Sequence, residues 1–260
     1  MTTTTAHDAA VEMNDTRLRL WPFRVLAGLV ALVMALTGGH NLVTGWTDPL
    51  DGGLHRIQEL HWGVAEGLLL AVSLAWQLRR PQRHVDAMRV AVAAVLAQLV
   101  VAAATLSPDP FAVVLLLLVG GALLAHPCRQ EVLRPVLQVR GRATAVGAAT
   151  AAALLGFAAV QVGDHYAAGP HDLLEAKTGW IGAAIGATAL AFVMLLAAFT
   201  GGRFSAALGA LGLLLLGTAS LLHPHLPSSF AVAGGAAAIA AAAAMVAMSW
   251  NSRRRLVQTS

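Results

Sequence analysis

Two histidine–glutamate pairs are the residues of this chain with the clearest potential for chemistry. His55 precedes Glu59 by four positions, and His171 precedes Glu175 by the same spacing. Both pairs sit in the pattern Gly-x-His-x3-Glu-x3-Gly. Histidine and glutamate are rare in this composition, so their repetition is informative where repeated alanine and leucine are not. An imidazole beside a carboxylate can move a proton or hold a metal or cofactor.

A third carboxylate, Glu66, follows the first pair along the same helix. At a helical rise of 1.5 Å per residue it lies roughly 10 Å below Glu59. It shares one face with His55, Glu59 and Trp62, because their spacings are near whole helical turns. A carboxylate inside a bilayer costs on the order of a few kcal/mol unless it is protonated, paired or hydrated, which makes Glu66 a site hypothesis. The pairs have a second interpretation, as local i,i+4 pairs at helix entrances that an ancestral duplication would copy.

The last predicted outer loop carries a weaker candidate site. His223 and His225 flank Pro224 and could supply metal ligands, although two histidines across a proline also form an ordinary polar turn. The sequence contains no Walker loop, G-x-S-x-G elbow, H-E-x-x-H motif or dinucleotide fingerprint. A phosphate-cradling site and a serine hydrolase are therefore unsupported.

The composition indicates an integral membrane protein. Apolar residues make up 57% of the chain and charged residues 12%, whereas a soluble domain carries about 25% charge. Eight apolar runs approach the length needed to cross a hydrocarbon core of roughly 30 Å. No run alternates as a membrane barrel would, so all eight are predicted to be helices. They lie near residues 25–45, 58–78, 88–106, 110–126, 143–163, 177–199, 204–222 and 229–250.

The arginines predict how these helices are oriented. With eight crossings the basic clusters fall on one side, and only Arg56 and Lys177 fall on the other. The positive-inside rule then places both termini in the cytoplasm of a multi-pass protein of the plasma (inner) membrane. The short basic clusters form no nucleic-acid face, so no nucleic-acid partner is expected. The histidine–glutamate pairs open to the outer side in this topology.

The repeated motif also predicts two similar halves. Four helices per half return the chain to its starting side, so the fold is predicted to be two parallel tandem four-helix bundles with a pseudo-two-fold axis along the membrane normal. The glycines of Gly63-x3-Gly67 and Gly182-x3-Gly186 form small-residue ridges at which helices can approach closely. The predicted domains are a polar N-terminus (1–22), a first repeat (23–127), a linker (128–142), a second repeat (143–250) and a basic tail (251–260).

This layout resembles heme A synthase, a membrane protein of eight helices arranged as two similar four-helix bundles. The local resemblance lies in His55-Arg-Ile-Gln-Glu59, in Gln98 and in Gly169-Pro170-His171. It implies an oxidative role for Glu59, which matches a glutamate that is important for the chemistry of that family. It also implies heme as a cofactor.

The heme ligands of that family lie on even-numbered helices, where this chain differs. The position near Trp62 carries no histidine, although His61 is adjacent and is therefore the candidate ligand. The comparable position of the sixth helix is near Lys177, and the eighth helix has no histidine. The fourth helix has only His126, at its end. The paired cysteines of the first outer loop are absent too.

The leading hypothesis is a membrane protein with an outward-facing His/Glu site that is redox-linked or binds heme, a transition metal or a quinone. Its candidate residues are Glu59, Glu66 and Glu175 for catalysis, His55, His61 and His171 for a cofactor, and His223 and His225 for a metal.

Two other functions stay open. The chain could be a small transporter in which Glu66 carries a proton or cation, although no predicted helix shows a break at mid-membrane. It could also be a non-catalytic subunit of a larger membrane complex, or a homo-oligomer, for which the small-residue faces are suited.

Overall fold

The computed structural model describes the backbone of residues 6–47, 55–107, 110–134, 137–139, 141–167 and 174–258, and side chains within 20–249 except 174–177. Every secondary-structure element in these ranges is helical. The predicted site residue His171 lies outside the described residues, and so does the side chain of Glu175.

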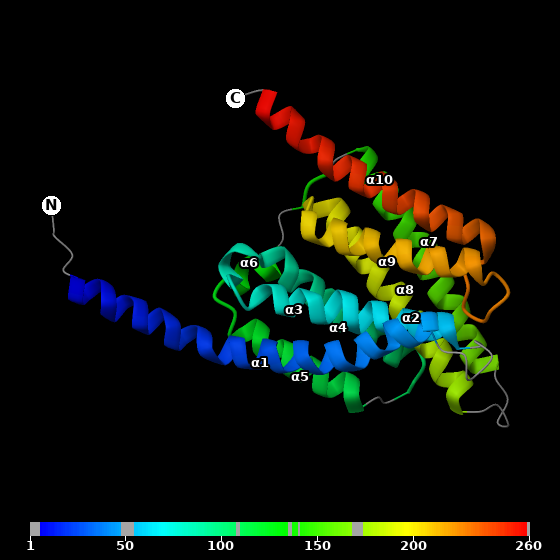
Figure 1. The fold of residues 1–260 in the computed structure, drawn as a ribbon, viewed down its shortest axis with the longest axis horizontal. Helices are drawn as coiled ribbons and strands as arrows, with labels where there is room; N and C mark the ends of the chain where they lie inside the picture. Colours follow the sequence, from blue (N-terminus) through cyan, green and yellow to red (C-terminus); the bar gives the residue numbers. More distant parts are fainter. Residues whose placement is uncertain are drawn as a thin grey trace.

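The helices follow one another with short connections (Figure 1). Before the linker they are α1 (Ala6–Thr47), α2 (Arg56–Trp62), η1 (Gly63–Ala71), α3 (Val72–Gln77), η2 (Pro81–Arg83), α4 (Val85–Ala104) and α5 (Pro110–Leu124). The linker contains α6 (Arg129–Leu133). After it come α7 (Arg142–Ala167), α8 (Leu174–Thr200), α9 (Arg203–Leu222) and α10 (Ala231–Gln258).

Six helical stretches of the described chain are long and apolar enough to cross a membrane. They are Leu20–Thr47, Val85–Ala104, Arg142–Ala167, Thr178–Thr200, Arg203–Leu222 and Ala231–Ser249. The protein is therefore a multi-pass helical membrane protein by length and composition. The other two predicted spans correspond to the α2–η1–α3 segment, which a π-helix divides, and to α5. With 15 residues, α5 is roughly 22 Å long, short of a 30 Å core, so the count of eight crossings stays a prediction.

The two terminal helices extend beyond the predicted apolar runs. The 42 residues of α1 begin at Ala6, and α10 continues to Gln258. Neither the stretch before Leu20 within α1 nor the one after Trp250 within α10 contains glycine or proline, so no residue type there stops the helix. These helix lengths do not test the predicted domain boundaries, which stay predictions.

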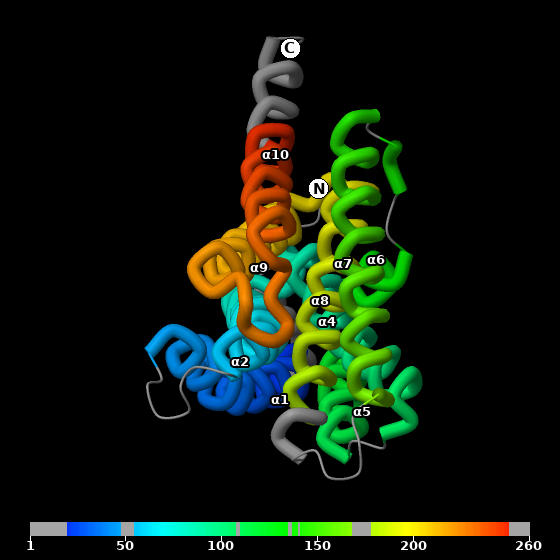
Figure 2. Tube along the Cα trace, turned by 90° about the vertical axis from the view of Figure 1, so that its right-hand side faces the viewer, coloured from blue at the N-terminus to red at the C-terminus, as the bar shows by residue number. Residues whose placement is uncertain are grey.

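The helices pack in the same cyclic order on both sides of the linker. In the first part α1 packs against η1, α3 against α4, α4 against α5, and α5 against α1. In the second part α7 packs against α8, α8 against α9, α9 against α10, and α10 against α7 (Figure 2). The two parts meet along α8, which contacts α2, η1 and α4.

α8 is the buried centre of this arrangement. In its most apolar stretch 78% of the residues are buried, compared with 22% in α7 and in α10. Glycines of α8 receive the side chains of α2: Gly179 faces Gln58, and a methyl group at Gly186 would lie 2.8 Å from His61 Nδ1. The ridge that includes Gly186 thus contacts the first part of the chain.

Regular α-helical geometry is interrupted between α2 and α3. The nine residues of η1 form a π-helix, and all of them are buried. Here η1 crosses α1 with backbone in contact with backbone: a methyl group at Gly38 would lie 2.7 Å from Gly67 Cα. The uniform apolar run predicts an unbroken α-helix, so the π-helical segment is a finding of the structure. It places Glu66 in the widened turn.

The crossing of α1 and η1 yields a paired test. Gly38→Ala should lower the free energy of unfolding by about 1–3 kcal/mol, because the added methyl group meets backbone that cannot move aside. Gly39→Ala adds the same group where nothing lies within 4 Å, and it should leave stability unchanged or slightly raised. Thermal unfolding of both variants in detergent measures the difference, and equal melting temperatures would contradict the close crossing.

Candidate functional site

A chain of hydrogen bonds links three segments at the end of the bundle where α2 begins. His55 Nδ1 lies 2.9 Å from Gln58 Oε1, so Nδ1 carries the proton of this bond. Gln58 Nε2 donates to Ser228 Oγ at 3.4 Å, and Ser228 Oγ donates to Gln161 Oε1 at 2.6 Å. All but His55 are buried. The chain of bonds ties α2 to α7 and to the loop before α10.

Beside this network, His61 is fully buried among aromatic rings. Its imidazole stacks on Phe157 with ring centroids 5.6 Å apart, and Phe230 meets it edge-on at the same distance. The backbone of Ser228 approaches the ring, but neither ring nitrogen reaches hydrogen-bonding geometry with a partner among the described residues. A buried polar group without a partner is unfavourable by about 1–3 kcal/mol. The site therefore has an unused hydrogen-bonding capacity.

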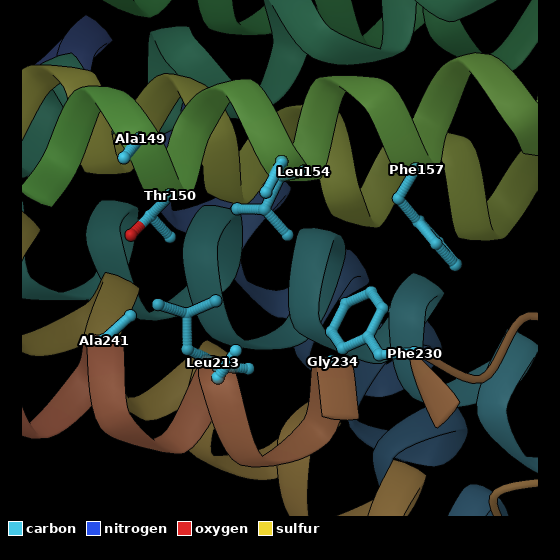
Figure 3. A pocket seen from close by; sticks show the side chains of 11 residues that line it. Ala149, Thr150, Leu154, Phe157, Leu213, Phe230, Gly234 and Ala241 are labelled. Atoms are coloured by element: carbon cyan, nitrogen blue, oxygen red, sulfur yellow. The ribbon is translucent and has the colours of Figure 1, made fainter. Parts of the chain in front are cut away.

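A pocket of about 400 Å³ lies next to this histidine, between α7, α9 and α10 (Figure 3). Its lining is almost wholly apolar and includes Leu154, Leu213 and Ala241. The polar side chain in the lining, Thr150, donates its hydroxyl to Val146 O of its own helix at 2.8 Å. Only 22% of the residues are buried in the most apolar stretches of α7 and α10, so the pocket lies toward the outside of the bundle rather than in its core.

Phe157 and Phe230 separate the pocket from His61. Both rings line the pocket, and they contact each other edge-to-face at 4.7 Å between centroids. The same two rings contact the imidazole. The two rings therefore lie between the imidazole and the apolar space.

The predicted acids lie away from this pocket. Glu59 is half-buried, and its Oε2 has no hydrogen-bond partner among the described residues. Glu66 is buried, and Thr37 Oγ1 donates to its Oε2 at 3.3 Å. Since Glu59 and His61 are two positions apart on α2, they point to nearly opposite sides of the helix. The structure therefore does not bring the candidate acids and His61 together.

The other predicted ligands are not gathered into one site. His55 bonds to Gln58, while His223 is half-buried and His225 exposed in the loop before α10. In the part of the chain that the structure describes, no group of three or more histidine, cysteine, aspartate and glutamate side chains could hold a metal ion. Gln98, a residue of the heme A synthase resemblance, is buried with Nε2 unpartnered.

A separate polar cluster lies at the opposite end of the first part of the chain, where α3, η2 and the end of α5 meet. Cys128 N–H donates to His126 Nδ1 at 3.1 Å, so His126 carries its proton on Nε2 and donates to Gln77 Oε1 at 3.2 Å. Gln77 Nε2 donates to His84 O. Burial raises the pKa of the Cys128 thiol, and the charge of Glu131 raises it further. The cluster is self-contained, which is typical of structural hydrogen bonding.

Sequence reasoning missed the residues that surround His61. Gln161 had a readable signal, because it is the amide in an otherwise apolar run and such residues face a partner in membranes. Phe157 and Phe230 had none, since aromatic residues are unremarkable in apolar helices. Both rings reach His61 only because α7 and the start of α10 pack near α2, which the sequence does not reveal.

Comparisons of this chain with protein-family models, with curated proteins and with solved structures find no match.

The residues around the pocket do not fit a heme. No histidine lines the pocket, and the ring of His61 is covered by Phe157 and Phe230 on the sides that face it. An axial ligand needs an open nitrogen directed at the iron. The heme that the resemblance to heme A synthase implies is therefore not placed in this pocket.

The loop before α10 is held by Ser228, which yields a second test. Ser228 has a φ of 60°, and alanine tolerates that backbone no better than serine, so Ser228→Ala isolates the hydroxyl. We expect a loss of about 1–3 kcal/mol of stability, because buried amide groups of Gln58 and Gln161 lose their partner. His225→Ala alters an exposed residue of the same loop and is the control. Equal melting temperatures in detergent would show that the network contributes nothing.

Proposed function

We propose that this multi-pass membrane protein binds a membrane-soluble ligand of the quinone class in the pocket between α7, α9 and α10. The observation that carries the proposal is the fully buried imidazole of His61, whose two nitrogens have no hydrogen-bond partner among the described residues and lie behind the rings of Phe157 and Phe230. The ligand's apolar tail lies in the pocket, and its polar head reaches His61 when one ring rotates. Such sites are mostly apolar with a few polar groups that fix orientation.

The hydrogen-bonding chemistry of a neutral imidazole matches this ligand class. Imidazole offers one donor and one acceptor. The donor suits a quinone carbonyl, and the acceptor suits the hydroxyl of the corresponding quinol. Gln161 lies one helical turn from Phe157 on α7, so the network that begins at His55 ends beside the head-group position.

The scaffold belongs to the same proposal. We infer two parallel four-helix repeats of the heme A synthase-like kind, with both termini cytoplasmic and the His61 region near the outer face. The shared cyclic packing order and the one-sided arginine clusters support it. Glu59 and Glu66 stay candidate proton acceptors on the other side of α2.

A bulky side chain in the pocket tests ligand binding. Ala241 lines the pocket, whereas its neighbour Ala240 is exposed and does not. With decylubiquinone added to the detergent-solubilised full chain, native mass spectrometry should show at least about tenfold weaker binding for Ala241→Phe and no change for Ala240→Phe. His61→Leu should weaken binding about tenfold through the lost hydrogen bond.

Two results would contradict the quinone proposal. Binding that is unchanged in Ala241→Phe would place the ligand elsewhere. No detectable binding of decylubiquinone by the native chain would exclude this ligand class.

A specific observation favours a second candidate function, proton- or cation-coupled transport. Glu66 is buried in the π-helical segment η1, and π-helical turns inside α-helices are frequent at functional sites. The sequence indicated no break in this helix, but a π-helical break is present at Glu66, the candidate carrier of a proton or cation. Thr37 of α1 hydrogen-bonds to its carboxyl group.

Transport is tested with the protein in vesicles that contain a pH-sensitive dye. Under an imposed pH gradient, Glu66→Gln should reduce proton flux at least about tenfold, because the amide cannot take up a proton. Glu131→Gln makes the same change at an exposed residue of the linker and should leave the flux unaltered. A flux through the native protein no greater than through protein-free vesicles would exclude this function.

A further inference from the structure

Another pocket, of about 310 Å³ and with charged residues in its lining, lies where the starts of α4 and α9 meet. Its lining comes from both parts of the chain: Trp76, Arg83 and Asp86 on one side, and Gly202, Arg203 and Phe204 on the other. It lies at the end of the bundle that carries the arginine-rich loops, opposite the network of Ser228. It is therefore separate from the quinone pocket.

The guanidinium groups of Arg83 and Arg203 are available to a ligand. Neither makes an ion pair or side-chain hydrogen bond with another described residue, although both line the pocket. Arginine is suited to phosphate because its planar fork presents parallel N–H donors. Two such groups in the lining of one pocket have the chemistry that a phosphate needs.

The negative charge of Asp86 does not neutralise both arginines of the pocket. Asp86 Oδ2 accepts hydrogen bonds from Ser205 N at 3.0 Å and Ser205 Oγ at 3.2 Å, so it caps the first turn of α9. Its other oxygen, Oδ1, is buried without a hydrogen-bond partner among the described residues. The positive end of the α9 dipole offsets part of its charge. With Arg83 and Arg203 charged, the pocket keeps a net positive charge.

Aromatic side chains place the pocket at the depth of lipid head groups. Trp76 is 53% exposed, its ring lies 5.9 Å from that of Phe204, and its Nε1 donates to His84 Nδ1 at 3.2 Å. A tryptophan with one polar contact and an exposed face is typical of the membrane–water boundary. A phosphate bound here is therefore level with the phosphates of the bilayer.

We propose that this pocket binds the phosphodiester head group of an anionic phospholipid, with Arg83 and Arg203 as its two clamps. Basic pockets between transmembrane helices at the arginine-rich face are suited to such head groups. Bound there, the lipid joins η2 of the first part to α9 of the second. The site does not depend on the quinone proposal.

Arginine variants of the full chain test this site. Native mass spectrometry with added phosphatidylglycerol should show about fivefold weaker binding for Arg83→Gln and for Arg203→Gln, and roughly 25-fold weaker binding for the double variant. Arg80→Gln is the matched control, because Arg80 is exposed in the same loop and does not line the pocket. The melting temperature of each variant without added lipid shows that the fold is retained.

The outcomes separate the sources of phosphate. An equal loss in Arg80→Gln would mean diffuse attraction to a basic surface and would overturn the site. Displacement of the lipid by millimolar inorganic phosphate would identify a free anion as the ligand and overturn the lipid assignment. Loss confined to Arg83 and Arg203, with no displacement by phosphate, supports the proposal.

Discussion

The close contact between α2 and α8 is the constraint on which the rest of this structure depends. Three glycines of α8 lie against Gln58, Trp62 and His61, and a methyl group at any of them would overlap those side chains. Without water in the hydrocarbon core, helices associate through such close packing and through hydrogen bonds. This contact sets how the first part of the chain meets the second, and it buries the polar side of α2.

Because this contact is made by α2, the order of helices around it is constrained. α1 meets the backbone of η1 most closely at Gly38, and α4 packs against α8 beside α2. The helices left at the periphery, α7 and α10, are joined to the centre chiefly through α8 and α9. A gap between them is consistent with this position, and the apolar pocket occupies that gap.

The sequence predicted the helical elements well and their local geometry less well. Long apolar runs specify helices in lipid because every backbone group must be satisfied internally, so α4, α7 and α9 begin and end near the expected residues. The π-helix of η1 could not be anticipated, because it arises where Gly38 of another helix approaches the backbone of Gly67. The short length of α5 reflects Pro108 before it, Pro110 at its first position and the turn after Leu124.

For the site, the repeated motif predicted candidate residues along the chain but not their partners across helices. The His/Glu motif marked the start of α2, but partners across helices are decided by packing: His55 bonds to Gln58, and Gln58 bonds to Ser228 far along the chain. Residues two apart on one helix face opposite ways, so α2 directs His61 to the aromatic rings and Glu59 to the other side. α2 therefore separates the carboxylate of Glu59 from the imidazole of His61. A proton that passes between them must travel around the helix through side chains of other segments.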